Sequence, residues 1–109
     1  MTVANAEVID FVSHNPKTDK VTLSMVEERE WGTEGSLLMD LQAKLNAYLT
    51  YVLDGQFERE YPQLRGKPLV FRLHYEFEPG PREAEFVRIV RERHLEPAGI
   101  EWEQARVGA

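Results

Sequence analysis

Residues 69–78, with the sequence LVFRLHYEFE, alternate apolar and polar side chains from Phe71 onward. Because successive side chains of a β-strand point to opposite faces, this pattern predicts a strand with one buried and one solvated face. A chain with such a strand needs a sheet that is covered on one side only. The apolar side consists of Leu69, Phe71, Leu73, Tyr75 and Phe77, and the polar side of Arg72, His74, Glu76 and Glu78.

Two further strands are predicted near the N-terminus. Residues 7–13 are rich in β-branched and aromatic side chains, and residues 20–26 alternate apolar with hydroxyl-bearing ones. The intervening residues 14–19 have turn chemistry, so the two strands should form a β-hairpin. Alternation in the second strand sends three side chains to the core and two to solvent: Val21, Leu23 and Met25, and Thr22 and Ser24.

Two amphipathic helices complete the expected fold. Apolar residues recur at spacings of three and four over residues 37–53 and again over residues 82–95. Residues 56–68 read as a loop with a helical turn at 58–61, and residues 100–102 are predicted to start a short edge strand. The inward residues of the second helix are Phe86, Val87, Val90 and Leu95.

The order of these elements predicts the α+β class. We expect a two-layer sandwich, with a three- or four-stranded sheet and two helices on one face, in the order β-β-α-β-α with an optional final strand. At 109 residues, a single domain should span residues 1–109, with short flexible ends at both termini.

The composition argues against several classes of protein. The formal net charge is -6 and no basic run is present, so binding of nucleic acid is not expected. Cysteine is absent, which excludes disulfides and fits a reducing compartment. No apolar run of about 20 residues and no secretory signal are found, so we expect a cytoplasmic protein without a membrane span.

The polar side of the sheet carries the candidate site. If Ile9 and Phe11 point inward, two imidazoles, a guanidinium and several carboxylates share the outer face. Such groups could bind a metal or perform acid–base chemistry if they converged, although cross-strand ion pairs are the ordinary outcome on an exposed sheet. The candidates are Asp10, His14, Arg72, His74 and Glu76.

No catalytic motif accompanies these residues, so we predict no cofactor and no metal site. The favoured hypothesis is a small acidic protein-interaction module that self-associates or binds a protein partner. Its candidate interface contains the outer-face residues Val12 and Val26 and also Trp31, which either folds back over the core or protrudes toward a partner. The alternative is a small hydrolase or metal-dependent enzyme that uses the polar outer face of the sheet.

Several segments also resemble a known family. These are residues 8–12 (VIDFV), 21–27 (VTLSMVE) and 41–49 (LQAKLNAYL), followed by Asp54 and Gly55. In this pattern the chain resembles an uncharacterised family of small bacterial proteins of about a hundred residues, over most of its length. The resemblance implies a free-standing bacterial cytosolic domain and supplies no activity. Within the third segment, Lys44 and Asn46 are expected to lie off the buried stripe of the helix.

Overall fold

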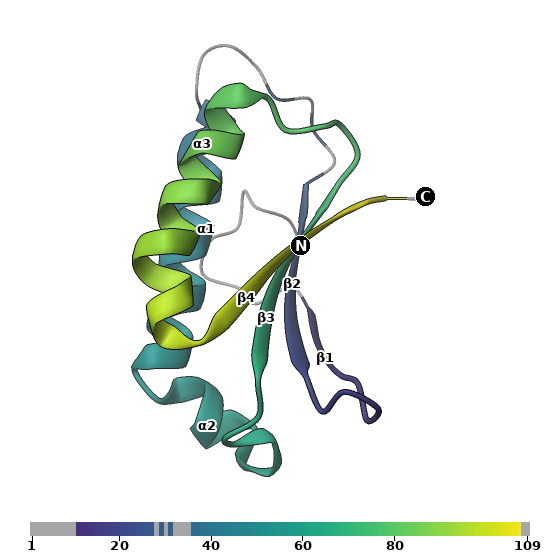
Figure 1. Cartoon of the computed structure of the whole chain (residues 1–109), viewed down its shortest axis with the longest axis vertical. Coiled ribbons are helices and arrows are strands. Elements are labelled where there is room, and N and C mark those ends of the chain that lie inside the picture. The colour runs from purple at the N-terminus through teal and green to yellow at the C-terminus, as the bar shows by residue number, and fades with distance from the viewer. Residues whose placement is uncertain (1–10, 28, 30, 32–35, 108–109) are drawn as a thin grey trace.

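The structure is a computed structural model that describes residues 11–27, 29, 31 and 36–107. The chain alternates strands and helices after an initial hairpin, which confirms the α+β class (Figure 1). The final strand is present and is seven residues long, rather than the three expected. The strands are β1 (Phe11–His14), β2 (Val21–Glu27), β3 (Leu69–Tyr75) and β4 (Ile100–Arg106), and the α-helices are α1 (Ser36–Leu53), α2 (Gln56–Glu60) and α3 (Pro81–Val90).

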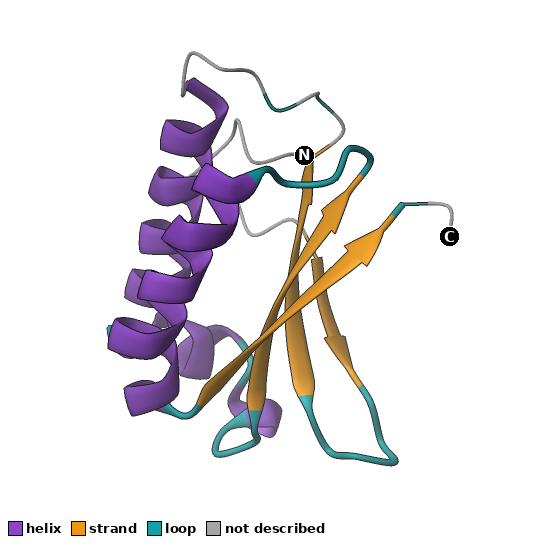
Figure 2. Cartoon of the chain, turned by 45° about the horizontal axis from the view of Figure 1, so that its top comes forward, coloured by secondary structure: helices purple, strands orange, loops and turns teal. Residues whose placement is uncertain are grey.

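The four strands form one sheet in the order β1-β2-β3-β4. β1 is antiparallel to β2, as expected for a hairpin, whereas β2, β3 and β4 run parallel. Parallel neighbours need a crossover connection, and α1 and α3 provide the two crossovers. Both helices lie on the same face of the sheet, which gives the expected two layers (Figure 2).

The core lies between these helices and the covered face of the sheet. Leu23 of β2 is aligned with Phe71 of β3, and both are fully buried. Tyr48 of α1 packs edge-on against Phe71, with ring centroids 5.6 Å apart, and its hydroxyl donates a hydrogen bond of 2.6 Å to the Ser24 carbonyl. α1 is therefore attached to the sheet by both an aromatic contact and a buried hydrogen bond.

Residues 56–68 contain more regular structure than a loop with one turn. Gly55 adopts a left-handed conformation (φ 86°) between α1 and α2, which turns the chain at the end of the long helix. The buried ring of Phe57 packs edge-on against Tyr51 and stacks on Tyr61, and so attaches the short helix to the core. A 3-10 turn at Pro62–Leu64 follows.

The second predicted helix changes its geometry before its end. α3 is α-helical to Val90 and continues as a π-helical turn, Arg91–Leu95. In a regular α-helix, residue 94 would follow Val87 and Val90 on the inward face. The wider π-helical turn instead brings Leu95 into the core and leaves His94 exposed, which accommodates the five-residue spacing from Val90 to Leu95.

Two side chains of β2 are less exposed than predicted. Thr22 and Ser24 point to the outer face, as predicted, yet both are buried rather than solvated. β2 is an inner strand of the sheet, so these small side chains are shielded by side chains on both neighbouring strands. In the case of Ser24, the aligned neighbours are Phe11 on β1 and Arg72 on β3.

Candidate functional site

The strongest candidate site lies on the outer face of the sheet, because no helix of the described chain covers that face (Figure 2). Strand register brings together residues that are far apart in the sequence. One row across the sheet contains Phe11, Ser24, Arg72 and Glu103, and the next contains Val26, His74 and Ala105.

The charged residues of this face neutralise one another. The Arg72 guanidinium donates hydrogen bonds to the Glu103 carboxylate from two nitrogens, with Nε at 2.8 Å. The Lys20 ammonium contacts both Glu101 carboxylate oxygens, at 3.0 and 3.1 Å. These are the cross-strand ion pairs expected of an exposed sheet, and partly exposed pairs of this kind stabilise a fold by only about 0–1 kcal/mol each.

His74 lies between the charged rows and the apolar part of the face. Its Nε2 is 3.3 Å from the Ser24 hydroxyl oxygen. Partial burial lowers the pKa of His74 below its ordinary value, and the positive charge of Arg72 lowers it further. The imidazole is therefore neutral at neutral pH, with one nitrogen able to donate and the other able to accept a hydrogen bond.

A pocket of about 340 Å³ opens beside His74. Two of its apolar residues are well exposed, Phe11 at 61% and Val107 at 45%. Its volume is at the small end of the range for ligand sites, and its mixture of apolar walls with a few polar groups is typical of them. The lining residues are Phe11, Ser24, Val26, His74, Arg106 and Val107.

The predicted polar cluster is only partly present. Arg72 and His74 share the outer face, but His14 and Val12 point to the other side, because Val12 is aligned with Leu23 and packs against the core. The assignment of Phe11 as an inward residue was therefore wrong, and with it the placement of Val12 and His14. Asp10 and Ile9 lie outside the described residues.

His14, the last residue of β1, instead contacts the hairpin turn. Its Nε2 is 2.9 Å from a carboxylate oxygen of Asp19, which also accepts a hydrogen bond of 2.7 Å from the Lys67 ammonium. These two contacts, that from Lys67 first, hold the pKa of Asp19 below its ordinary value. The fifth candidate, Glu76, follows β3 and is exposed, and its backbone amide donates to the Glu27 carbonyl.

Trp31 folds back toward the core. Its ring packs against the hydrophobic core, and its indole nitrogen donates a hydrogen bond of 2.8 Å to the Phe77 carbonyl. This contact joins the connection after β2 to the segment after β3. It agrees with the first of the two alternatives for Trp31, in which the ring covers the core.

Sequence reasoning missed three buried charged side chains, Glu27, Lys44 and Glu83. Lys44 was expected off the buried stripe, but it is 0% exposed, and its ammonium lies 5.5 Å from the centre of the Tyr48 ring. The sequence contained a signal for this burial. Lys44 follows Leu41 by three residues and precedes Tyr48 by four, and both of these residues lie on the inward side of α1.

Glu27 is buried at the end of β2 and is paired with Arg29. The guanidinium of Arg29 contacts both carboxylate oxygens of Glu27, one of them at 2.6 Å, and reaches Asp40 of α1 at 3.3 Å. These carboxylates, Glu27 first, raise the pKa of Arg29. Every buried side-chain nitrogen and oxygen of the described chain has a hydrogen-bond partner, so these buried charges serve the fold.

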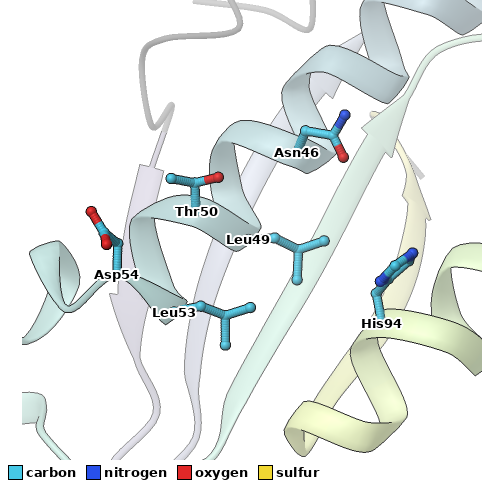
Figure 3. A pocket seen from close by; sticks show the side chains of 6 residues that line it. All are labelled: Asn46, Leu49, Thr50, Leu53, Asp54 and His94. Carbon is cyan, nitrogen blue, oxygen red and sulfur yellow. The ribbon is translucent and has the colours of Figure 1, made fainter.

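A second hollow lies between the end of α1 and the π-helical turn (Figure 3). Its volume is about 440 Å³, and Leu49 and Leu53 of α1 face His94 across it. Of the remaining lining residues, Thr50 and Asp54 point away from His94, whereas Asn46 points to the same side of α1 as Leu49. Thr50 and Asp54 therefore do not join His94 in one polar site.

The outer face presents a hydroxyl next to an imidazole. A serine beside a neutral imidazole is the first part of a nucleophile–base pair, but Ser24 is only 3% exposed, which keeps its hydroxyl from a substrate. No group of three or more metal-ligating side chains suited to an ion occurs among the described residues. No helix in the described part of the chain is both long enough and apolar enough to cross a membrane.

Comparison with known proteins identifies one family. The model of the Family of unknown function (DUF6572) matches residues 1–106, almost the whole chain. Neither the curated proteins nor the solved structures contain a match to the sequence.

Proposed function

The chain belongs to DUF6572, a family of unknown function, and we propose that it is a protein-interaction module that self-associates through the uncovered face of its sheet. The observation that carries this proposal is the exposed ring of Phe11 beside the pocket at His74. The absence of cysteine fits a cytoplasmic setting.

A second copy of the chain is the occupant that the geometry favours. In a twofold-symmetric dimer the same patch of both subunits meets, so a patch must provide both a projection and a recess. The outer face provides both, because Phe11 projects at 61% exposure and the pocket lies next to it. Phe11 of each copy would fill the pocket of the other copy.

The charge distribution supports the same occupant. Two molecules with a net charge of -6 repel each other over most of their surfaces. On the outer face, however, Glu101 and Glu103 are paired with Lys20 and Arg72. This face is therefore a place where two acidic copies can meet, and it offers no excess of negative charge to a basic partner.

The size of the face predicts a weak dimer. Three strands of seven residues and one of four, about 4.8 Å apart and at about 3.3 Å per residue, outline roughly 400 Å². Stable dimers bury about 800 Å² on each partner. We therefore expect an association that depends on protein concentration, rather than an obligate dimer.

The free edge of β4 is a less suitable contact. Edge strands that carry charged side chains are protected against pairing with other strands. β4 carries Glu101, Glu103 and Arg106 along its seven residues, and a second copy would bring the same acidic side chains close together. Contact through the apolar part of the outer face, around Phe11, would not bring these acidic side chains together.

Sedimentation velocity over a range of protein concentrations tests the proposal. The wild-type chain should show a sedimentation coefficient that rises with concentration, and Phe11→Asp should remain monomeric at every concentration. Met39→Asp is the matched control, because Met39 is an exposed apolar residue of α1 at 69% and lies far from the pocket residues in the sequence. A wild-type chain that stays monomeric, or a Phe11→Asp variant that associates like the wild type, would overturn the proposal.

A further inference from the structure

His74 is the side chain of the pocket lining whose charge changes near neutral pH. It stands on the outer face, aligned with Val26 of β2 and Ala105 of β4. Phe11, which projects from the same face at 61% exposure, lines the same pocket. When the pocket of one copy receives Phe11 of another copy, an imidazole and an apolar ring must therefore share it.

We propose that His74 is a pH-sensitive switch of self-association, and that its protonation dissociates the second copy from the pocket. The inference rests on the proposed dimer and adds the regulation of that same contact. In the monomer the ring is only partly buried, so an imidazolium there keeps part of its hydration. In the dimer, Phe11 of the other copy would displace this water, and its apolar ring offers no hydrogen bond to replace it.

The charged groups of β3 and β4 near His74 do not compensate for this loss. Arg72 lies two residues before His74 on the same face of β3, so its positive charge opposes a second one. Glu103 of β4 is aligned with Arg72 and already accepts hydrogen bonds from it. Glu76 lies two residues beyond His74, outside β3, and is exposed, so solvent screens its charge.

The other lining residues bring no carboxylate to the imidazole. Those of β1 and β2 are uncharged, namely Phe11, Ser24 and Val26. Arg106 also lines the pocket, but the register aligns it with Tyr75 on the covered side of the sheet, and its charge acts there. Among the described residues, a protonated His74 would therefore lie in the closed pocket without a counterion.

The direction of the effect follows from proton linkage. Burial, and after it the charge of Arg72, hold the pKa of His74 below its ordinary value in the single chain. An apolar ring that closes the pocket lowers this pKa further, so the monomer takes up protons that the dimer does not. Association should therefore weaken as the pH falls through the pKa of the monomer. The loss of net negative charge toward the isoelectric point of about 5.1 acts in the opposite direction, because it reduces the repulsion between two copies.

Sedimentation velocity at about pH 7.5 and about pH 5.5 tests the switch, and circular dichroism at both pH values establishes that the chain is folded. The dissociation constant of the wild-type dimer should be at least about five-fold higher at the lower pH. His74→Gln should lose this increase, since its side chain takes up no proton, and His74→Leu should behave in the same way. His14→Gln and His94→Gln should retain the increase, because neither residue lines the pocket.

A second measurement follows the His74 ring itself. Its pKa, measured by NMR, should be lower at a protein concentration where the dimer prevails than at one where the monomer prevails. An equal pKa at both concentrations would overturn the inference. The same holds for a His74→Gln dimer that keeps the wild-type increase, and for a wild-type dimer that tightens on acidification, as an imidazolium stacked on the incoming ring would produce.

These results distinguish the switch from the dimer. Each of the three contradicting outcomes is observed on a dimer that exists, so it would remove the switch and leave the proposed function in place. A chain that stays monomeric at both pH values would overturn the proposed dimer and the switch together.

Discussion

The two faces of the sheet are built from the same strands but have opposite properties. On the covered face, Leu23, Phe71 and Leu73 are completely buried beneath the helices. The uncovered face carries two ion pairs and a pocket, and the ring of Phe11 is mostly exposed. The comparison predicts that the covered face supplies most of the stability of the fold, whereas the exposed residues of the uncovered face can change with little loss of stability.

The strongest test of this difference is to replace one phenylalanine on each face by alanine and to compare the loss of stability. Phe71→Ala should lower the free energy of unfolding by about 3–5 kcal/mol, because it removes a buried ring and leaves a cavity next to Tyr48. Phe11→Ala should lower it by less than about 1 kcal/mol, because the ring is already in contact with water. Chemical denaturation of both variants measures the difference. Equal losses would show that the outer face also belongs to the core.

Two neighbours in β1 allow a finer comparison with a charged substitution. Val12→Asp should destabilise the fold by about 2–3 kcal/mol, because Val12 packs against the core and a carboxylate there loses its hydration. Phe11→Asp should leave the free energy of unfolding almost unchanged, since its side chain faces solvent. Thermal unfolding of both variants at one protein concentration separates the two effects. A stable Val12→Asp variant would place Val12 on the outer face after all.

The arrangement of elements was predictable because local patterns determine it. The alternation of residues 71–78 indicated a sheet with one covered face, and the helical spacing of residues 37–53 indicated its cover. The structure confirms both, although β3 ends at Tyr75 and Phe77, expected on the buried side, is 41% exposed. The sequence also contained a signal for the π-helical turn, because the apolar residues Val90 and Leu95 are five residues apart. The structure buries both of them.

The candidate site was harder to predict because it depends on strand register. Phe11 and Val12 are both apolar, so their sequence alone does not decide which of them points inward. The alignment of Phe11 with Ser24 and Arg72 decides it, and pairing across strands is a tertiary property. The pocket likewise joins residues from β1, β2, β3 and β4 whose spacing in the sequence carries no common pattern.

The smallest expected effect concerns the pH dependence of stability, and it arises from His74 on the uncovered face. The pKa of His74 is lowered in the folded chain by burial and by Arg72, whereas the unfolded chain has the ordinary value near ~6.5. As the pH falls below this value, the unfolded state takes up a proton that the folded state does not. Stability should therefore decrease until the pH reaches the lowered pKa of the folded state.

His74→Gln should remove this contribution, so its free energy of unfolding should fall less than that of the wild type between about pH 7 and pH 5. His94→Gln is the matched control, because it leaves Ser24, Arg72 and His74 in place. Asp19 and Glu85 do not interfere, since ion pairs hold their pKa values below this window. Urea denaturation at several pH values measures the slopes. If His74→Gln retained the wild-type slope, the outer face would be more hydrated at His74 than its contacts with Ser24 and Arg72 imply.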